Sequence, residues 1–199
     1  MTETPLDATG TRLDRRRAAA LAAVSCVAGA VLQLGYGVAA IAVGYPRITE
    51  PAFEAVWLLV NLGMAGGLAG WLLLDVAWPR RLALIAGGTA IAGQLLRVAV
   101  SIWLIADQSA AVDGPIVAGI LLMFAGLGTL GVCTLRGPLT GWPSWAPLTT
   151  VAAGIVTAAW YSIDRPTHFV LLGLLWGTAW TAFALTLRRL TVVGHVHKP

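Results

Sequence analysis

Residues 82–106 read LALIAGGTAIAGQLLRVAVSIWLIA, an apolar run in which Arg97 is the one ionisable side chain. A bilayer-spanning helix needs about 20 predominantly apolar residues, so this run is long enough to cross a membrane. The segments on either side of such runs contain Pro, Gly, Asp and Arg, which end helices or resist burial in hydrocarbon. Further apolar stretches cover residues 18–44, 52–77, 115–135, 146–163 and 167–187. The sequence therefore predicts an all-α integral membrane protein, a bundle of six transmembrane helices.

The composition excludes an ordinary soluble domain. Of the 199 residues, 58% are hydrophobic and 11% are charged, whereas soluble domains carry about 25% charged residues. The mean hydropathy is +0.80. We expect a disordered cytoplasmic tail at residues 1–17, one transmembrane domain at 18–189 and a second tail at 190–199. The bias toward Ala, Gly and Arg, with a single lysine, predicts a bacterial source.

The distribution of basic residues predicts the orientation. Positive charge is retained on the cytoplasmic side of a bilayer, so the side with more Arg and Lys should face inward. With the N-terminus inside, the outer loops hold Arg47 and Arg165. The inner side then holds Arg12, Arg15, Arg16, Arg17, Arg80, Arg81, Arg136, Arg188, Arg189 and Lys198. We therefore predict a multi-pass protein of the plasma membrane with both termini in the cytoplasm.

Small residues recur at four-residue spacing in the second and sixth stretches. Such spacing lets two membrane helices approach closely. We expect packing within the chain, and a homodimer is the alternative. Its seam would run through Gly63, Gly67 and Gly70 or through Gly173 and Gly177.

Arg97 is the strongest indication of a functional site. It lies nine residues before Ala106, about 13 Å along a helix axis, and arginine keeps its charge because its pKa exceeds 12. Ionisable side chains inside membrane spans are costly and usually mark a function. Gln94 and Ser101 share its helical face. On neighbouring helices, Gln33 and Asn61 are expected at a similar depth. Glu54 is expected nearer the outer surface, where Arg97 could extend to meet it, and Tyr36 is expected near the level of Glu54.

Two interpretations fit this cluster. In the first, Arg97 is a structural clamp that pairs with Glu54 and ties helices together through Asn61 and Gln33. In the second, the cluster is a polar niche open to the outer side, where Arg97 binds an anionic group of an amphipathic ligand. Trp176 and Trp180 recur at i+4 and are expected either to fill the core or to line a cavity for such a ligand.

The sequence contains no motif that names a reaction. HExxH, Gly-x-Ser-x-Gly and Asp-rich metal motifs do not occur, so we predict no metal and no cofactor. No basic stripe with interleaved aromatics occurs either, which argues against nucleic acid. The leading prediction is a protein that binds a lipophilic or amphipathic ligand or a membrane partner. A metal-free acid catalyst acting on an isoprenoid-like substrate is the alternative, and a transporter is the third. The proton donor of the alternative would be Glu54, Asp107 or Asp164.

Overall fold

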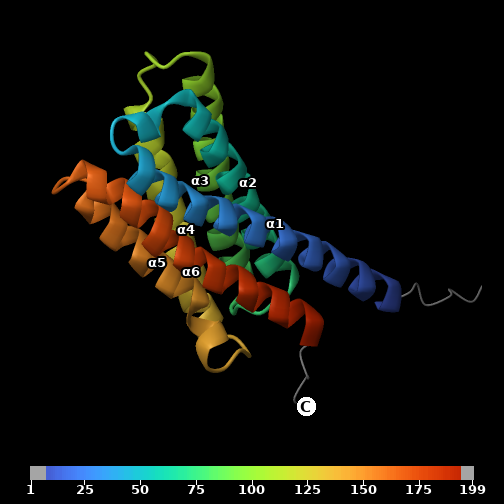
Figure 1. Ribbon diagram of the computed structural model, residues 1–199. Coiled ribbons are helices and arrows are strands. Elements are labelled where there is room, and N and C mark those ends of the chain that lie inside the picture. Colours follow the sequence, from blue (N-terminus) through green and yellow to red (C-terminus); the bar gives the residue numbers. More distant parts are fainter. Residues whose placement is uncertain (1–7, 194–199) are drawn as a thin grey trace, which may run out of the picture.

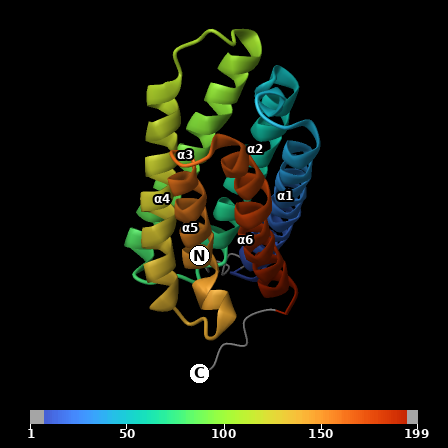
Figure 2. The same ribbon diagram turned by 60° about the vertical axis from the view of Figure 1, so that its left-hand side comes forward.

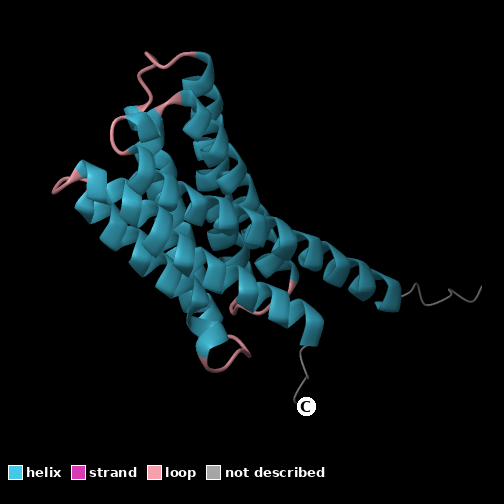
Figure 3. Ribbon diagram, viewed as in Figure 1, coloured by secondary structure: helices cyan, strands magenta, loops and turns pink. Residues whose placement is uncertain are grey.

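The computed structural model describes residues 8–193, and Figure 3 shows this part of the chain as helices joined by short loops. Predictions that concern residues 1–7 and 194–199 fall outside the described part. A 3-10 turn, η1 (Arg47–Thr49), precedes the second helix. The helices are α1 (Ala8–Val43), α2 (Pro51–Leu73), α3 (Arg80–Ala106), α4 (Asp113–Leu135), α5 (Trp142–Trp160) and α6 (Arg165–Val193).

The helices form a closed ring (Figures 1 and 2). Each helix packs against the next one in the chain, and α6 closes the ring against α1. The helix α2 also reaches α6 across the interior. Since short loops join the helices, neighbours run in opposite directions, and alternate loops lie at the same end of the bundle.

The two ends of the bundle differ in charge. We call the end with loops 44–50, 107–112 and 161–164 the acidic end, because Glu50, Asp107, Asp113 and Asp164 lie there. We call the other end, where α1 begins and α6 ends, the basic end. Its exposed arginines are Arg15, Arg16, Arg17, Arg80, Arg81, Arg136, Arg188 and Arg189.

Large apolar side chains cover the outside of the bundle. Leu21, Ile85 and Val192 are 73%, 67% and 77% exposed, and a soluble protein rarely exposes contiguous apolar surface on this scale. Five helices, α1, α2, α3, α4 and α6, are long and apolar enough to cross a membrane. The chain is therefore a multi-pass helical membrane protein.

The helix α5 departs from the others. It is 19 residues long, and its composition does not place it among the five apolar spans. It begins at Trp142 rather than at the predicted residue 146. The chain turns at Gly141, whose φ is 69°, and Pro143 falls in the first helical turn, where proline's missing N–H costs no hydrogen bond.

The prediction of a disordered tail is wrong for residues 8–17, because α1 already begins at Ala8. Arginine, leucine and alanine favour helix, and no proline separates this segment from the span that follows. At 36 residues, α1 is about 54 Å long, so it extends well beyond a hydrocarbon core of about 30 Å. The other end of the domain differs too, since α6 continues to Val193.

Glycines allow the closest helix contacts within the chain. A Cβ atom on Gly63 would lie 2.6 Å from the backbone oxygen of Ser25 and 2.9 Å from the Cα atom of Gly29. Gly67 and Gly70 also face α1, and Gly173 and Gly177 face α1 from α6. A second copy of the chain could reach these glycines only by displacing α1.

Candidate functional site

Arg97 lies between α3 and α4 toward the acidic end. Its Cγ and Cδ atoms would be 3.2 and 3.3 Å from a Cβ atom on Gly119, so the absence of a side chain at Gly119 leaves room for the arginine stem. The Nη1 atom is buried and has no hydrogen-bond partner among residues 8–193. The side chain of Arg97 is thus partly buried, with one buried donor nitrogen that has no partner in the described residues.

The expected ion pair between Glu54 and Arg97 is not formed. No nitrogen of Arg97 comes within 4.0 Å of a carboxylate oxygen in the described part of the chain. Instead, the hydroxyl of Ser101 donates a hydrogen bond of 3.2 Å to Oε2 of Glu54, which links α3 to α2. The two charges remain close enough to interact through space.

The other predicted partners of Arg97 bond elsewhere. The side-chain amide of Asn61 donates to the backbone oxygen of Trp57, 2.6 Å away in the same helix. The amide of Gln33 donates to the backbone oxygen of Leu172 at 2.7 Å, so Gln33 joins α1 to α6. The clamp centred on Arg97 is therefore not present. The sequence did not indicate that Gln33 would bond to the backbone oxygen of Leu172, because every residue of a helix has such an oxygen.

Gln94 lies one turn deeper than Arg97 and is fully buried. Its Nε2 atom is 3.1 Å from the sulfur of Met123 and 3.7 Å from that of Met64. Thioether sulfur is a weak acceptor. Its Oε1 atom, like that of Gln33, is buried without a partner in the described chain. Unsatisfied polar atoms thus continue from Arg97 toward the middle of the bundle.

Aromatic side chains border Glu54. The ring of Tyr36 packs edge-on against Phe53 and Trp57, with centroid distances of 6.2 and 4.9 Å. We call the group formed by these side chains the Arg97 niche. Its members are Tyr36, Glu54, Trp57, Arg97 and Ser101.

Trp176 and Trp180 are buried and fill the core. Trp176 packs against Phe124 of α4 with a centroid distance of 6.0 Å. Trp180 packs against Phe183 at 5.3 Å, and Phe183 in turn stacks on Trp71. Both indole Nε1 atoms are without a partner in residues 8–193. The aromatic pairs of these two tryptophans involve Phe124 and Phe183 and no member of the Arg97 niche.

Two of the three candidate acids lie outside the niche. Asp107 is exposed, and the hydroxyl and the backbone N–H of Ser109 donate to it at 2.6 and 2.9 Å. These hydrogen bonds lower the pKa of Asp107, whereas a proton donor needs a raised one. The carboxylate of Asp164 accepts hydrogen bonds from Thr167 at the start of α6. Only Glu54 of the three contributes to the niche.

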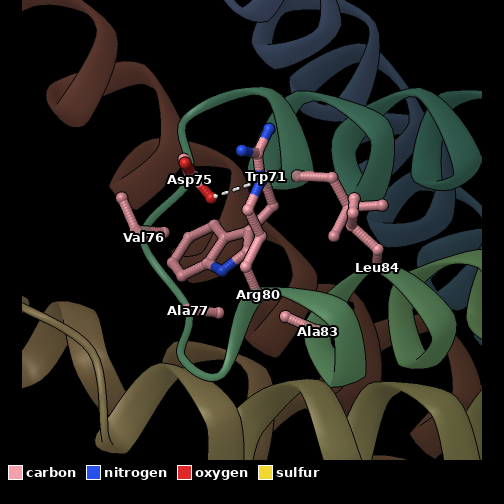
Figure 4. Close-up of a pocket in the computed structure, with 8 residues that line it drawn as sticks. Trp71, Asp75, Val76, Ala77, Arg80, Ala83 and Leu84 are labelled. Carbon is pink, nitrogen blue, oxygen red and sulfur yellow. Dashed lines mark ion pairs between the residues drawn. The ribbon is translucent and has the colours of Figure 1, made fainter.

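A small pocket that the sequence did not indicate lies at the basic end, where α2 turns into α3 (Figure 4). The side chains of Asp75 and Arg80 form an ion pair of 3.3 Å at its edge, and both are about half exposed, so the pair contributes little to stability. Its volume of about 10 Å³ is roughly that of one water molecule. The lining residues are Trp71, Leu72, Asp75, Val76, Ala77, Arg80, Ala83 and Leu84.

The niche and the pocket lie at opposite ends of the bundle, and only the niche combines a buried charge with polar and aromatic neighbours. Among residues 8–193, no three His, Cys, Asp or Glu side chains gather in the way that metal binding requires. Comparison with protein families, with curated proteins and with solved structures finds no match to this chain.

Proposed function

We propose that this protein binds an amphipathic ligand in the membrane and that Arg97 contacts the anionic group of that ligand. The observation that carries the proposal is the buried Nη1 atom of Arg97, which has no partner in the described residues. A guanidinium group presents several N–H donors in a plane and binds carboxylate or phosphate with two parallel hydrogen bonds. An anionic ligand would therefore satisfy the free donor.

The clamp interpretation requires Arg97 to bond to side chains of other helices. Glu54, Asn61 and Gln33 each have another hydrogen-bond partner, so the guanidinium contributes no bond that ties these helices together. Leaving a buried charge unpaired is expensive. Such a cost is common at binding sites, where the missing partner arrives with the ligand.

The headgroup of the ligand would lie near Phe53, Tyr36 and Trp57, and its apolar part would follow the apolar outer surface of the bundle. These rings offer large apolar surfaces, and Tyr and Trp also carry a polar atom at the edge. Ligand sites generally combine apolar walls with a few convergent polar groups. The Arg97 niche combines both kinds of group toward one end of a membrane bundle.

Replacing Arg97 with glutamine should weaken the retention of phospholipid, because the guanidinium would no longer bind the phosphate group. The protein would be placed in nanodiscs of phosphatidylglycerol and phosphatidylethanolamine. Native mass spectrometry would then count the phospholipids that stay bound after the protein is released from the nanodisc. A hydrogen bond to a charged group contributes about 1.5–3 kcal/mol, so the affinity should fall by about tenfold to a hundredfold. Arg136→Gln, at an exposed position of the basic end, is the control and should retain lipid normally. Equal retention by Arg97→Gln would contradict the proposal.

In this proposal all six helices cross the plasma membrane. The helix α5 joins loop 136–141 at the basic end to the acidic-end loop 161–164, and its 19 residues extend about 28 Å. The hydroxyls of Thr150 and Thr157 donate to the backbone oxygens of Ala146 and Ala153. Because these hydroxyls form hydrogen bonds within the helix, burying them costs less free energy than the amino-acid composition alone would indicate.

Cysteine labelling tests the orientation, in which the basic end faces the cytoplasm. Cys26 and Cys133 are buried and would first be replaced with alanine. Gln108→Cys at the acidic end and Thr140→Cys at the basic end are both at exposed positions. A membrane-impermeant maleimide should label Gln108→Cys in intact cells and Thr140→Cys only after permeabilisation. The reverse pattern would place the termini outside.

A further inference from the structure

The Arg97 niche contains two opposite charges that do not pair with each other. Arg97 has no carboxylate oxygen within 4.0 Å, and Glu54 has no basic nitrogen within that distance in residues 8–193. Glu54 is only partly buried, and its one side-chain hydrogen bond comes from the neutral hydroxyl of Ser101. Neither charge is therefore bonded directly to an opposite charge in residues 8–193, and two groups that bonded to them would have opposite sign.

The charges also differ in depth. Glu54 is in the first turn of α2 and bonds to Ser101, five residues before the end of α3. Arg97 is one helical turn deeper on α3, about 6 Å along the axis. Its stem lies over Gly119, six residues inside α4. From the acidic end inward, the order is thus a carboxylate and then a guanidinium.

We infer that the ligand of the Arg97 niche is a zwitterionic aminophospholipid, whose ammonium group binds Glu54 and whose phosphate binds Arg97. This inference rests on the function proposed above and names the ligand class. In a membrane leaflet the ammonium group of such a lipid lies outermost, the phosphate lies deeper and the acyl chains lie deepest. The carboxylate and the guanidinium of the niche occur in the complementary order.

The neighbours of Glu54 fit an ammonium group as well. Charge-assisted hydrogen bonds from a primary ammonium to a carboxylate are about twice as strong as neutral ones. Trp57 lies about one helical turn after Glu54 on α2 and packs against Tyr36, and aromatic faces attract cations. An anionic lipid without an amine, such as phosphatidylglycerol, would place its phosphate at Arg97 but leave the carboxylate of Glu54 without a counter-charge, so it would bind less tightly.

The sign of the effect of Glu54→Gln distinguishes the two ligand classes. Glutamine keeps an oxygen that can accept from Ser101, so the link between α2 and α3 is retained while the charge is removed. Native mass spectrometry in mixed nanodiscs would give the ratio of bound phosphatidylethanolamine to bound phosphatidylglycerol. We expect the wild-type protein to favour phosphatidylethanolamine and Glu54→Gln to lower that ratio by about tenfold, the effect of one lost charge pair. Glu50→Gln, an exposed acid of the adjacent loop, should leave the ratio unchanged.

Three other outcomes would contradict the ligand assignment, the proposed function or both. If the wild type favours phosphatidylglycerol and Glu54→Gln strengthens its binding, the ligand is a simple anion, and the proposed function survives through the loss seen in Arg97→Gln. If neither Glu54→Gln nor Arg97→Gln changes lipid retention, the two charges are bridged by water and both proposals fail. If soluble O-phosphoethanolamine binds the lipid-free protein in detergent as tightly as the lipid does, the assignment to a membrane lipid is wrong.

Discussion

Replacing Arg97 with methionine is expected to raise the free energy of unfolding of the lipid-free protein by about 1–3 kcal/mol. The arginine stem lies between α3 and α4, and the Nη1 atom is buried without a partner in residues 8–193. Methionine is unbranched and can follow the path of the arginine stem over Gly119, so the packing of the stem is retained. The substitution therefore removes the cost of an unpaired charge and breaks no hydrogen bond within the described protein.

The measurement is thermal or denaturant unfolding of delipidated protein in a mild detergent. Arg136→Met is the matched control, since Arg136 is exposed at the basic end, and its stability should stay within experimental error of the wild type. A clear loss of stability in Arg97→Met would show that the arginine holds helices together, which is the clamp that the sequence left open. A gain in stability together with a loss of lipid retention is the pattern of a binding residue.

Replacing Gly63 with leucine is expected to prevent α1 and α2 from packing and to lower the stability by about 3 kcal/mol. Even the Cβ atom would lie 2.6 Å from the backbone oxygen of Ser25, and backbone atoms cannot move aside as a flexible side chain can. The remaining atoms of leucine would push the two helices further apart. Because membrane helices associate mainly through close packing, this separation removes the contacts that stabilise the pair.

Gly35→Leu is the control for this prediction. Gly35 is exposed on α1, and nothing lies within 4 Å of a Cβ atom placed there. Its replacement should be neutral or slightly stabilising, because leucine favours helix more than glycine does. Yield of monodisperse protein and the unfolding temperature would be compared for the two variants. Equal behaviour would mean that α1 and α2 do not approach at Gly63 as the structure has it.

Most of the fold could be predicted from hydropathy and helix-breaking residues. The predicted run 82–106 corresponds closely to α3, which covers Arg80–Ala106, because Pro79 and Asp107 bound it. The prediction was less accurate where polar residues continue a helix. The residues before 18 were expected to be disordered, yet α1 includes residues 8–17. Hydropathy reports transfer into lipid and says little about whether a polar segment outside the membrane is helical.

The members of the site could be predicted better than their bonds. Helical periodicity places Gln94, Arg97 and Ser101 on one face, and the structure buries Gln94 and Ser101. The pairing of Glu54 with Ser101 rather than with Arg97 depends on how α2 and α3 are turned relative to each other. That rotation follows from contacts between the two helices, such as that of Gly87 with Leu72. Periodicity within one helix carries no information on it.

In the protein with its ligand bound, the free donor of Arg97 should be occupied by the anionic group of that ligand. An experimental structure of the protein isolated together with its native lipids tests this most directly. We expect a phosphate or carboxylate oxygen of a non-protein molecule about 2.8 Å from the Arg97 guanidinium, with an ammonium group next to Glu54. A map in which Arg97 is bonded directly to Glu54, with lipid nowhere near the niche, would contradict it.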